Sequence, residues 1–353
     1  MIRPKKLNKG DKIAVVSLSR GILGMPFCKH ELEIGLQRLK DFGLIPVVMP
    51  NALKDINYLE NHPEAKAADL KMAFMDDSIK GIICAIGGDD TYRTIPYLME
   101  DAKFINAVKT YPKIFMGFSD TTNNHLMFYK LGLQTFYGQA FLTDLAELDT
   151  EMVPYTKKYF EKLFMDSHTY EITSSPVWYF ERENFGPEEI GKPRNSQIEK
   201  HGFEVLNGKG KVIGELYGGC IESLYDAYTG ERHGDDNEIY AKYNLLPTLD
   251  EWKEKILFLE TSEEQIFPNR LEQILMTLKN NKILENVKGI LVGKPMNEKY
   301  YEEYKEVYRK VVANLDTPVL YNVNFGHSIP RCIIPYGAKA IIDCDNKKIT
   351  VNI

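Results

Sequence analysis

The chain has 353 residues, 44% hydrophobic and 27% charged, so it can bury a large core, and its length suggests about two domains. The formal charge of −6, without any block of Lys and Arg, argues against a nucleic-acid-binding protein or a protein of anionic membrane surfaces. Small molecules or peptides are therefore the expected partners.

The five cysteines are widely spaced, odd in number and without a C-x-x-C pair, which argues against a disulfide framework or a zinc knuckle. They fit a reducing compartment, so we expect a cytoplasmic protein. The apolar run at 13–18 is too short for a signal peptide, and no apolar segment is long enough for a membrane span. We interpret that run as the first buried strand.

Over residues 1–165, short apolar runs alternate with helical patterns. The expected strands are 13–18, 44–50, 81–88 and 113–118. The expected helices are 28–43, 65–76 and 95–107. This alternation is typical of an α/β domain, Rossmann-like, in which a parallel sheet carries helices on both faces.

Two polar segments follow strands of this domain, GGDDT at 87–91 and GFSDTT at 117–122. Because ligands bind beyond the carboxyl ends of parallel strands, both segments should face one crevice. Ser119 stands on a strand-to-helix turn, which can expose its hydroxyl and aim helix amides at a reacting group. Ser followed by Asp and Thr is also the pattern of an ordinary helix N-terminus, and Thr121 replaces the second glycine of G-x-S-x-G. The serine therefore needs partners from elsewhere in the chain.

Residues 166–210 show no sustained period, and we interpret them as a connector with an ordered loop. Trp178, Tyr179, Phe180 and Phe185 make this segment too aromatic for a solvated tether. Their expected use is packing or stacking on a ligand.

From residue 211 to 353 the alternation resumes, with shorter strands and more turns. The expected strands are 211–219, 255–261, 289–294 and 318–327, with helices at 221–230, at 268–279 and between the last two strands. The polar turn at Asp345 and Asn346 predicts a closing hairpin over 338–353. The economical interpretation is a second, mixed α/β domain.

Two residues of this second half could complete a nucleophilic site. Glu260 ends the apolar strand ILFLE, and His327 follows the apolar run YNVNFG. With Ser119 they would form a set in which the imidazole takes the hydroxyl proton and the carboxylate fixes its tautomer. Taken singly, His327 also fits a structural histidine and Glu260 a helix-start acid. The other histidines lie within expected helices or polar stretches.

Four segments occur in the order IGGDDT, GFSDTT, LFLE and GHSIPRCIIPYG. This combination resembles the LD-carboxypeptidase family of serine peptidases, and within it the microcin C immunity branch, over nearly the whole chain. The resemblance implies Ser119 as nucleophile, His327 as general base and Glu260 as its orienting carboxylate. It further implies an oxyanion hole formed by the amides of Gly88 and Asp120.

The same resemblance implies an α/β nucleophile domain followed by a smaller C-terminal domain that carries Glu260 and His327, usually within a homodimer. Gly87, Asp89, Trp178 and Cys220 are the expected substrate-binding residues. Cys220 stands where the family usually has the asparagine of G-G-N, and the early strand ends in SLSRG where many members have Pro-Ser. The Cys220 difference affects the expected hydrogen bonds that support the site, and the SLSRG difference affects substrate contacts.

Two substrate classes are open. The long segment with Trp178 is more similar to the immunity branch, where a tryptophan stacks on the nucleobase of an aminoacyl-nucleotide analogue. The wider family instead trims the terminal D-alanine of murein tetrapeptide. In both cases Ser119 attacks an amide carbonyl and water releases the acyl group. No H-E-x-x-H or comparable spacing is present, so we expect neither a metal nor a cofactor.

Two other classes of protein remain as alternatives. A buried strand followed by GGDDT is similar to the G-G-D-G-[ST] of nucleotide-dependent kinases, although Asp90 replaces the glycine that admits phosphate. A two-domain α/β small-molecule sensor would use the same crevice without chemistry and leave Ser119 unreactive.

Overall fold

The computed structural model describes residues 1–166 and 169–352. They form two compact units: unit 1 is Met1–Asp166 with Arg182–Arg194, and unit 2 is Ser167–Glu181 with Asn195–Ile353. The units are nearly equal in length, and each is described by itself. Positions 167, 168 and 353, which belong to the expected connector and the expected last hairpin, lie outside the described residues.

Unit 1 is built on a parallel sheet in the order β5-β4-β3-β1-β2. Its strands are β1 (Lys12–Val16), β2 (Ile45–Val48), β3 (Ile79–Cys84), β4 (Ile114–Gly117) and β5 (Thr135–Tyr137). Strand β4, which has a neighbour on each side, is buried along its whole length, which is why it forms a continuous apolar run in the sequence. The strand order reverses between β1 and β3, so the segments after β1, β3 and β4 are where such a sheet binds ligands.

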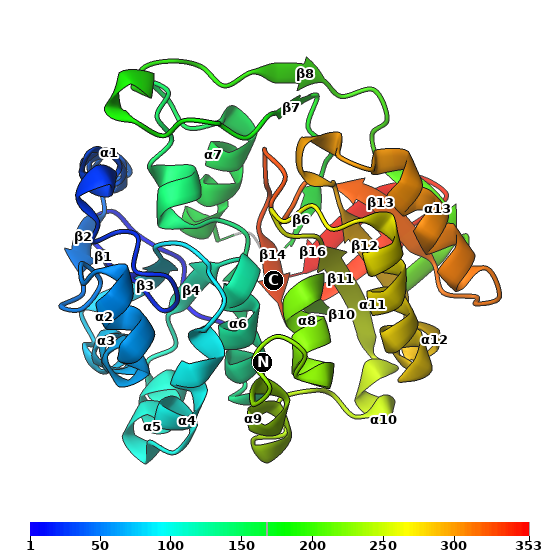
Figure 1. Cartoon of the computed structure of the whole chain (residues 1–353), viewed down its shortest axis with the longest axis horizontal. Helices are drawn as coiled ribbons and strands as arrows, with labels where there is room; N and C mark the ends of the chain where they lie inside the picture. Colours follow the sequence, from blue (N-terminus) through cyan, green and yellow to red (C-terminus); the bar gives the residue numbers. More distant parts are fainter. Residues whose placement is uncertain (167–168, 353) are drawn as a thin grey trace. The chain divides into compact units, whose positions relative to one another are not determined.

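Helices cover both faces of this sheet, as the alternation predicts. One side carries α1 (Lys29–Asp41) and α7 (Pro154–Glu161), and the other carries α3 (Pro63–Met75), α4 (Ile95–Met99) and α5 (Ala102–Thr110) (Figure 1). The unit also contains α2 (Ile56–Asn61) and α6 (Thr122–Lys130). The prediction of a Rossmann-like α/β domain is confirmed.

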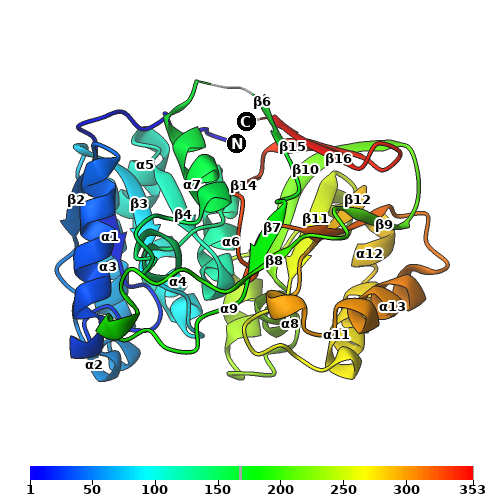
Figure 2. The same ribbon diagram turned by 90° about the horizontal axis from the view of Figure 1, so that it is seen from above.

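Unit 2 contains an eight-stranded mixed sheet in the order β6-β16-β15-β10-β11-β12-β13-β9. Its parallel centre is β10 (Lys211–Cys220), β11 (Lys255–Glu260), β12 (Gly289–Gly293) and β13 (Val319–Val323). The predicted closing hairpin is confirmed as β15 (Lys339–Asp343) paired antiparallel with β16 (Lys348–Asn352), drawn in red in Figure 2. Its turn is fixed by the Asn346 amide, which donates to Asp343 Oδ1 at 3.1 Å.

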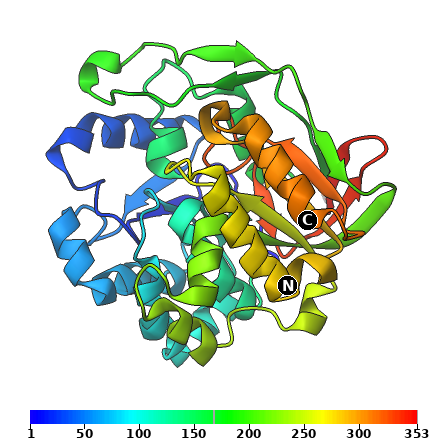
Figure 3. The same cartoon turned by 45° about the vertical axis from the view of Figure 1, so that its right-hand side comes forward.

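The helices of unit 2 fill the crossovers between its parallel strands. They are α8 (Ile221–Thr229), α9 (Asp236–Lys242), α10 (Leu249–Trp252), α11 (Pro268–Asn280), α12 (Ile283–Asn286) and α13 (Tyr301–Val312). The two long helices, α11 and α13, lie side by side (Figure 3). On α13 the buried residues Tyr304, Val307, Tyr308 and Val311 follow the spacing of one apolar helix face. Beyond β13 the chain adds the short β14 (Ile334–Tyr336).

The expected connector at 166–210 contains more regular structure than its sequence indicates. It carries β6 (Thr169–Ile172) and β9 (Glu204–Asn207), which pair with β16 and β13 at the two ends of the unit 2 sheet. It also carries β7 (Val177–Tyr179) and β8 (Ser196–Ile198), which pair with each other. Strands of three or four residues are too short to produce a recognisable period, so the sequence could not separate them from loop.

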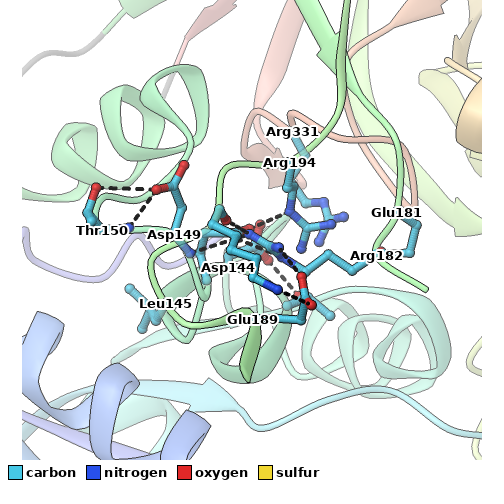
Figure 4. A network of polar contacts seen from close by, with 12 residues as sticks. Asp144, Leu145, Asp149, Thr150, Glu181, Arg182, Glu189, Arg194 and Arg331 are labelled. Atoms are coloured by element: carbon cyan, nitrogen blue, oxygen red, sulfur yellow. Dashed lines mark hydrogen bonds and ion pairs between the residues drawn. The ribbon is translucent and has the colours of Figure 1, made fainter. Parts of the chain in front are cut away.

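The middle of this segment, Arg182–Arg194, belongs to unit 1 because of a buried charge network (Figure 4). Arg182 Nη2 lies 2.7 Å from Glu147 Oε1, and Arg194 Nε bonds the other oxygen of the same carboxylate. Arg182 also reaches Glu189 Oε2 at 3.8 Å. Two guanidinium groups on one buried carboxylate hold the loop with directed, charge-assisted hydrogen bonds.

Candidate active site

Ser119 occupies a strained turn between β4 and α6. Its φ is 63°, in the left-handed region that non-glycine residues rarely adopt and that costs about 1–3 kcal/mol. The turn is fixed on both sides: the Ser119 amide donates to the Tyr137 hydroxyl at 3.1 Å, and the Thr122 hydroxyl donates to the Ser119 carbonyl at 2.7 Å. An ordinary helix cap has extended backbone and needs no such strain, so the geometry favours the nucleophile interpretation over capping.

Glycines after β3 allow the backbone to approach this serine. A Cβ added at Gly87 would lie 2.7 Å from Ser119 Cβ, 2.9 Å from its Oγ and 3.4 Å from the Asp120 amide nitrogen. At Gly88, where φ is 149°, a Cβ would lie 2.3 Å from the Ser19 hydroxyl. The segments 87–91 and 117–122, which were predicted to share one crevice, are therefore in contact. This contact leaves no room for a side chain at position 87.

The Asp120 side chain ties three strand ends together. It is buried and accepts from the Ser19 hydroxyl after β1 at 2.6 Å, from the Thr91 amide after β3 at 2.9 Å, and from Asn123 Nδ2 at 2.6 Å. Burial raises its pKa to about 6, although these hydrogen bonds favour the charged form. The Asp120 carboxylate thus holds the strand ends together. This role is separate from the one predicted for the Asp120 backbone amide, which is to donate in the oxyanion hole.

The second aspartate of GGDDT forms an ion pair with a buried lysine. Asp90 pairs with Lys66 Nζ at 2.7 Å to each oxygen, and the Lys66 side chain is only 1% exposed. Asp89, the residue predicted to bind substrate, is exposed. The sequence analysis missed Lys66, because a lysine inside a helix gives no signal that it is buried.

In unit 2 the predicted carboxylate and histidine are in contact. His327 Nδ1 lies 2.7 Å from Glu260 Oε2, and the His327 amide donates to the same oxygen at 3.1 Å. Gly326 makes this possible, since a Cβ there would lie 2.4 Å from the Glu260 carboxylate carbon. A carboxylate on Nδ1 places the reactive proton position on Nε2, which is the arrangement a general base requires.

A second carboxylate, missed by the sequence analysis, faces the other ring nitrogen. Glu263 Oε2 lies 2.9 Å from His327 Nε2. Burial lowers the pKa of His327, but the charges of Glu260 and Glu263 outweigh it and raise the pKa to about 10. The only sequence signal was that Glu263 stands three residues after a strand-end carboxylate.

Cys220 ends β10 directly beside the end of β11, in register with Glu260. It is buried, and its Sγ lies 3.3 Å from Glu222 Oε2, so burial and the neighbouring carboxylates hold its pKa well above the usual range. Glu222 in turn accepts from the Ser262 amide at 3.0 Å and the Ser262 hydroxyl at 2.8 Å. The thiol is therefore neutral and in contact with Glu222, and a substrate-binding role for it stays a prediction.

Trp178 lies on β7 and is 5% exposed. Its ring meets Phe180 edge-on at 4.6 Å between centroids, and Lys294 Nζ lies 5.2 Å from its centre. Phe185, by contrast, is 41% exposed. Packing is thus established for Trp178, while stacking on a ligand remains a prediction.

Three further observations concern metal-binding groups, membrane-spanning helices and the cysteines. Across residues 1–166 and 169–352, no group of three His, Cys, Asp or Glu side chains is arranged to hold a metal ion. In the same ranges no helix combines the length and apolar character needed to cross a bilayer. All five cysteines are buried and unpaired with one another.

A Rossmann-like sheet with a strained serine at a strand end, and a second sheet with a carboxylate-oriented histidine, indicate an enzyme of the hydrolase class. Comparison with known families agrees. Residues 13–138 match the LD-carboxypeptidase N-terminal domain, and residues 213–342 match the LD-carboxypeptidase C-terminal domain. The chain belongs to the LD-carboxypeptidase family, and the predicted family is confirmed.

Relatives come from both branches of this family. A probable murein peptide carboxypeptidase of Bacillus subtilis is 28% identical over 99% of this chain and 94% of its own length. The microcin C7 self-immunity protein MccF of Escherichia coli is 29% identical over 81% of this chain and 77% of its own length.

Solved structures agree with this assignment. An MccF-like protein from Streptococcus pneumoniae in complex with AMP is 47% identical, with a TM-score of 0.93 and coverage of 97% of this chain and 98% of that one. MccF in complex with aspartyl sulfamoyl adenosine is 26% identical, with a TM-score of 0.83 and coverage of 100% and 99%.

Proposed function

We propose that the protein is a serine peptidase or amidase in which Ser119 is the nucleophile, His327 the general base and Glu260 its orienting carboxylate. The observation that carries this proposal is the strained φ of Ser119 against the bare backbone of Gly87, because such strain persists where a site requires it. The 2.7 Å contact between His327 and Glu260 supplies the second half of the argument.

In the proposed reaction, Ser119 Oγ bonds to the carbonyl carbon of an amide while His327 Nε2 takes the hydroxyl proton. The amides of Gly88 and Asp120 are the proposed donors to the oxyanion, and loss of one such donor typically costs about 100- to 1,000-fold in turnover. The carbon–nitrogen bond then breaks as the imidazolium returns its proton to the leaving nitrogen. Water, activated by His327, releases the acyl group from Ser119.

The substrate class we favour is an aminoacyl or peptidyl nucleotide, as in microcin C immunity. In support, the 47% identical neighbour is an MccF-like protein in complex with AMP, and MccF itself binds aspartyl sulfamoyl adenosine. The second candidate is the terminal D-alanine of murein tetrapeptide, which the murein peptide carboxypeptidase relative favours. Gly87, Asp89, Trp178 and Cys220 remain proposed substrate contacts.

A hydrolysis screen tests the proposal. Wild type and Ser119→Ala are incubated with an aminoacyl sulfamoyl adenosine and with murein tetrapeptide, and products are quantified by mass spectrometry. We expect wild type to cleave one of them and Ser119→Ala to lose the activity with an unchanged circular dichroism spectrum. Most of the activity surviving in Ser119→Ala would reject the nucleophile.

The kinase and sensor alternatives give different results in the same screen. ATP turnover would indicate a kinase, and a ligand-induced rise in melting temperature without products would indicate a sensor. The proposal also includes the homodimer implied by the resemblance, which light scattering of the purified chain would test.

A further inference from the structure

His327 lies between two carboxylates that differ in their surroundings. Glu260 contacts Nδ1 at 2.7 Å, and its side chain is fully buried. Glu263 contacts Nε2 at 2.9 Å, and its side chain is 64% exposed. The Glu260 contact is therefore fixed by the protein interior, whereas the Glu263 carboxylate can leave Nε2 for solvent or for a ligand.

The backbone that carries Glu263 is held in place. On its N-terminal side, Ser262 donates twice to Glu222, at 3.0 and 2.8 Å. On its C-terminal side, the Gln265 amide closes a turn onto the Ser262 carbonyl at 3.2 Å, with Gln265 at a φ of 48°. Only the Glu263 side chain needs to move for Nε2 to be released.

The other charged groups near the imidazole have partners of their own, so the contact between Glu263 and His327 Nε2 is the one that can change. Arg331 faces the His327 carbonyl, with its Nη2 at 3.4 Å, and Arg232 is paired with Glu264 at 2.7 Å. Glu222 is held by Ser262 and by the Cys220 thiol. Glu263 thus has His327 as its partner, and its pKa is lowered to about 2, mainly by that contact and to a smaller extent by the charge of Arg232.

This arrangement has a cost for catalysis. An imidazole between two carboxylates is held as imidazolium, with its pKa raised to about 10. A protonated Nε2 that already donates to Glu263 cannot accept the proton of a serine hydroxyl. The histidine becomes a base when another cation takes the Glu263 carboxylate and the Nε2 proton passes to water.

The position of Nε2 indicates which cation this is. In acyl transfer Nε2 delivers a proton to the leaving nitrogen, so a carboxylate at Nε2 lies beside the scissile bond. The α-ammonium of an aminoacyl group is separated from the scissile carbonyl by a single carbon and suits that carboxylate. A free carboxylate next to the leaving nitrogen, as in a terminal amino acid, would be repelled.

We propose that Glu263 is a specificity residue that selects acyl groups with a free α-ammonium, which takes the Glu263 carboxylate from Nε2 and so releases His327 as the base. This inference rests on the proposed function and deepens it, because it favours the aminoacyl-nucleotide class over terminal amino acids.

Binding to a Ser119→Ala chain, which cannot turn the ligand over, tests the selection by calorimetry. The ligands are an aminoacyl sulfamoyl adenosine and the same compound acetylated on its α-nitrogen. A charge-assisted hydrogen bond predicts about 10- to 100-fold tighter binding of the free amine. Adding Glu263→Gln should abolish the difference. Adding Glu264→Gln, the neighbouring acid paired with Arg232, should preserve it.

A nuclear magnetic resonance titration of the His327 ring measures the pKa of His327. That pKa would stay the same if Glu263 only supported the local structure. Glu263→Gln removes a negative charge from Nε2, so the pKa of His327 should fall, and the acid limb of kcat/KM should shift to lower pH. Glu264→Gln should leave both nearly unchanged.

The outcomes separate this inference from the proposed function. Equal binding of both ligands, failure of the free amine to bind, or a preference that survives Glu263→Gln would overturn the role of Glu263. A Glu263-dependent preference without hydrolysis by wild type would support that role and reject the peptidase instead.

Discussion

The Ser119 turn (residues 117–122) and the His327 cluster (Glu260, Glu263 and His327) are held by different forces. Sterics fix the turn: a left-handed φ, a bare glycine backbone and neutral hydrogen bonds leave the serine no alternative position. Charge holds the cluster, through two carboxylates on one imidazole. The position of the serine should therefore change little between pH 7 and pH 10, where Asp120, with a pKa of about 6, stays ionised. The protonation state of His327 should depend on both pH and salt.

The largest effect is expected from removing the base. His327→Ala should reduce kcat by about 10⁶-fold, and Glu260→Gln by about 10⁴-fold, because an orienting carboxylate is partly replaceable. Steady-state kinetics on the cleaved substrate measures both. An equal loss in the two variants, with both still folded, would contradict the division of roles within the cluster.

Gly87→Ala tests whether steric contacts fix the position of Ser119. Its Cβ would lie 2.7 Å from Ser119 Cβ, so the serine must shift, and a misplacement of about 1 Å can cost 10²-fold in rate. Gly132→Ala is the control, since that position has a positive φ of 84° but open space around it. Kinetics should show the loss in Gly87→Ala alone.

The charges of the His327 cluster make the free energy of unfolding depend on pH. The folded pKa of His327, about 10, lies above the unfolded value of about 6.5, so the stabilisation it provides is complete below about pH 6.5 and is lost as pH rises through about 10. Urea unfolding of wild type should therefore show a larger loss of stability between pH 7 and pH 10 than His327→Ala. Parallel curves for the two proteins would contradict the raised pKa.

The smallest effect on rate is expected at Lys66, whose partner Asp90 lies beside the site. Lys66→Met removes a 1%-exposed ammonium but leaves Asp90, with 14% of its side chain exposed, partly solvated. Unfolding free energy should fall by about 2 kcal/mol, less than the 3–5 expected for a fully buried pair. The melting temperature reports this loss, and kcat should change by less than about 10-fold at temperatures where the variant is folded.

Sequence periodicity was sufficient for the elements that are long or fully buried. Strands β1, β3 and β4 of unit 1 were predicted because burial on both faces leaves a continuous apolar run, and the 339–352 hairpin because a polar turn separates two apolar runs. The three-residue strand β5 was not predicted. The regular structure of the connector at 166–210 could not be predicted, because its strands are too short. Its loop at 182–194 is held by Glu147, a carboxylate distant in the sequence.

At the site, strand-end placement of Ser119, Glu260 and His327 could be predicted from where apolar runs stop. Glu263, Glu222 and Lys66 could not, since only the tertiary fold brings an acid of a polar loop, an acid at a helix start or a lysine on a helix to its partner. The strained φ of Ser119 is likewise a property of the folded turn, because serine itself prefers ordinary backbone.

The central claim is that Ser119 is a nucleophile activated by His327. Its most direct test is mass spectrometry of the intact chain after treatment with a fluorophosphonate, followed by peptide mapping. Because a fluorophosphonate has no ammonium to draw Glu263 from His327, the test uses Glu263→Gln. We predict a single adduct on Ser119 in that variant and at least a 100-fold slower reaction when His327→Ala is added to it. An adduct on another residue, or equal labelling of Ser119 in both proteins, would contradict the account.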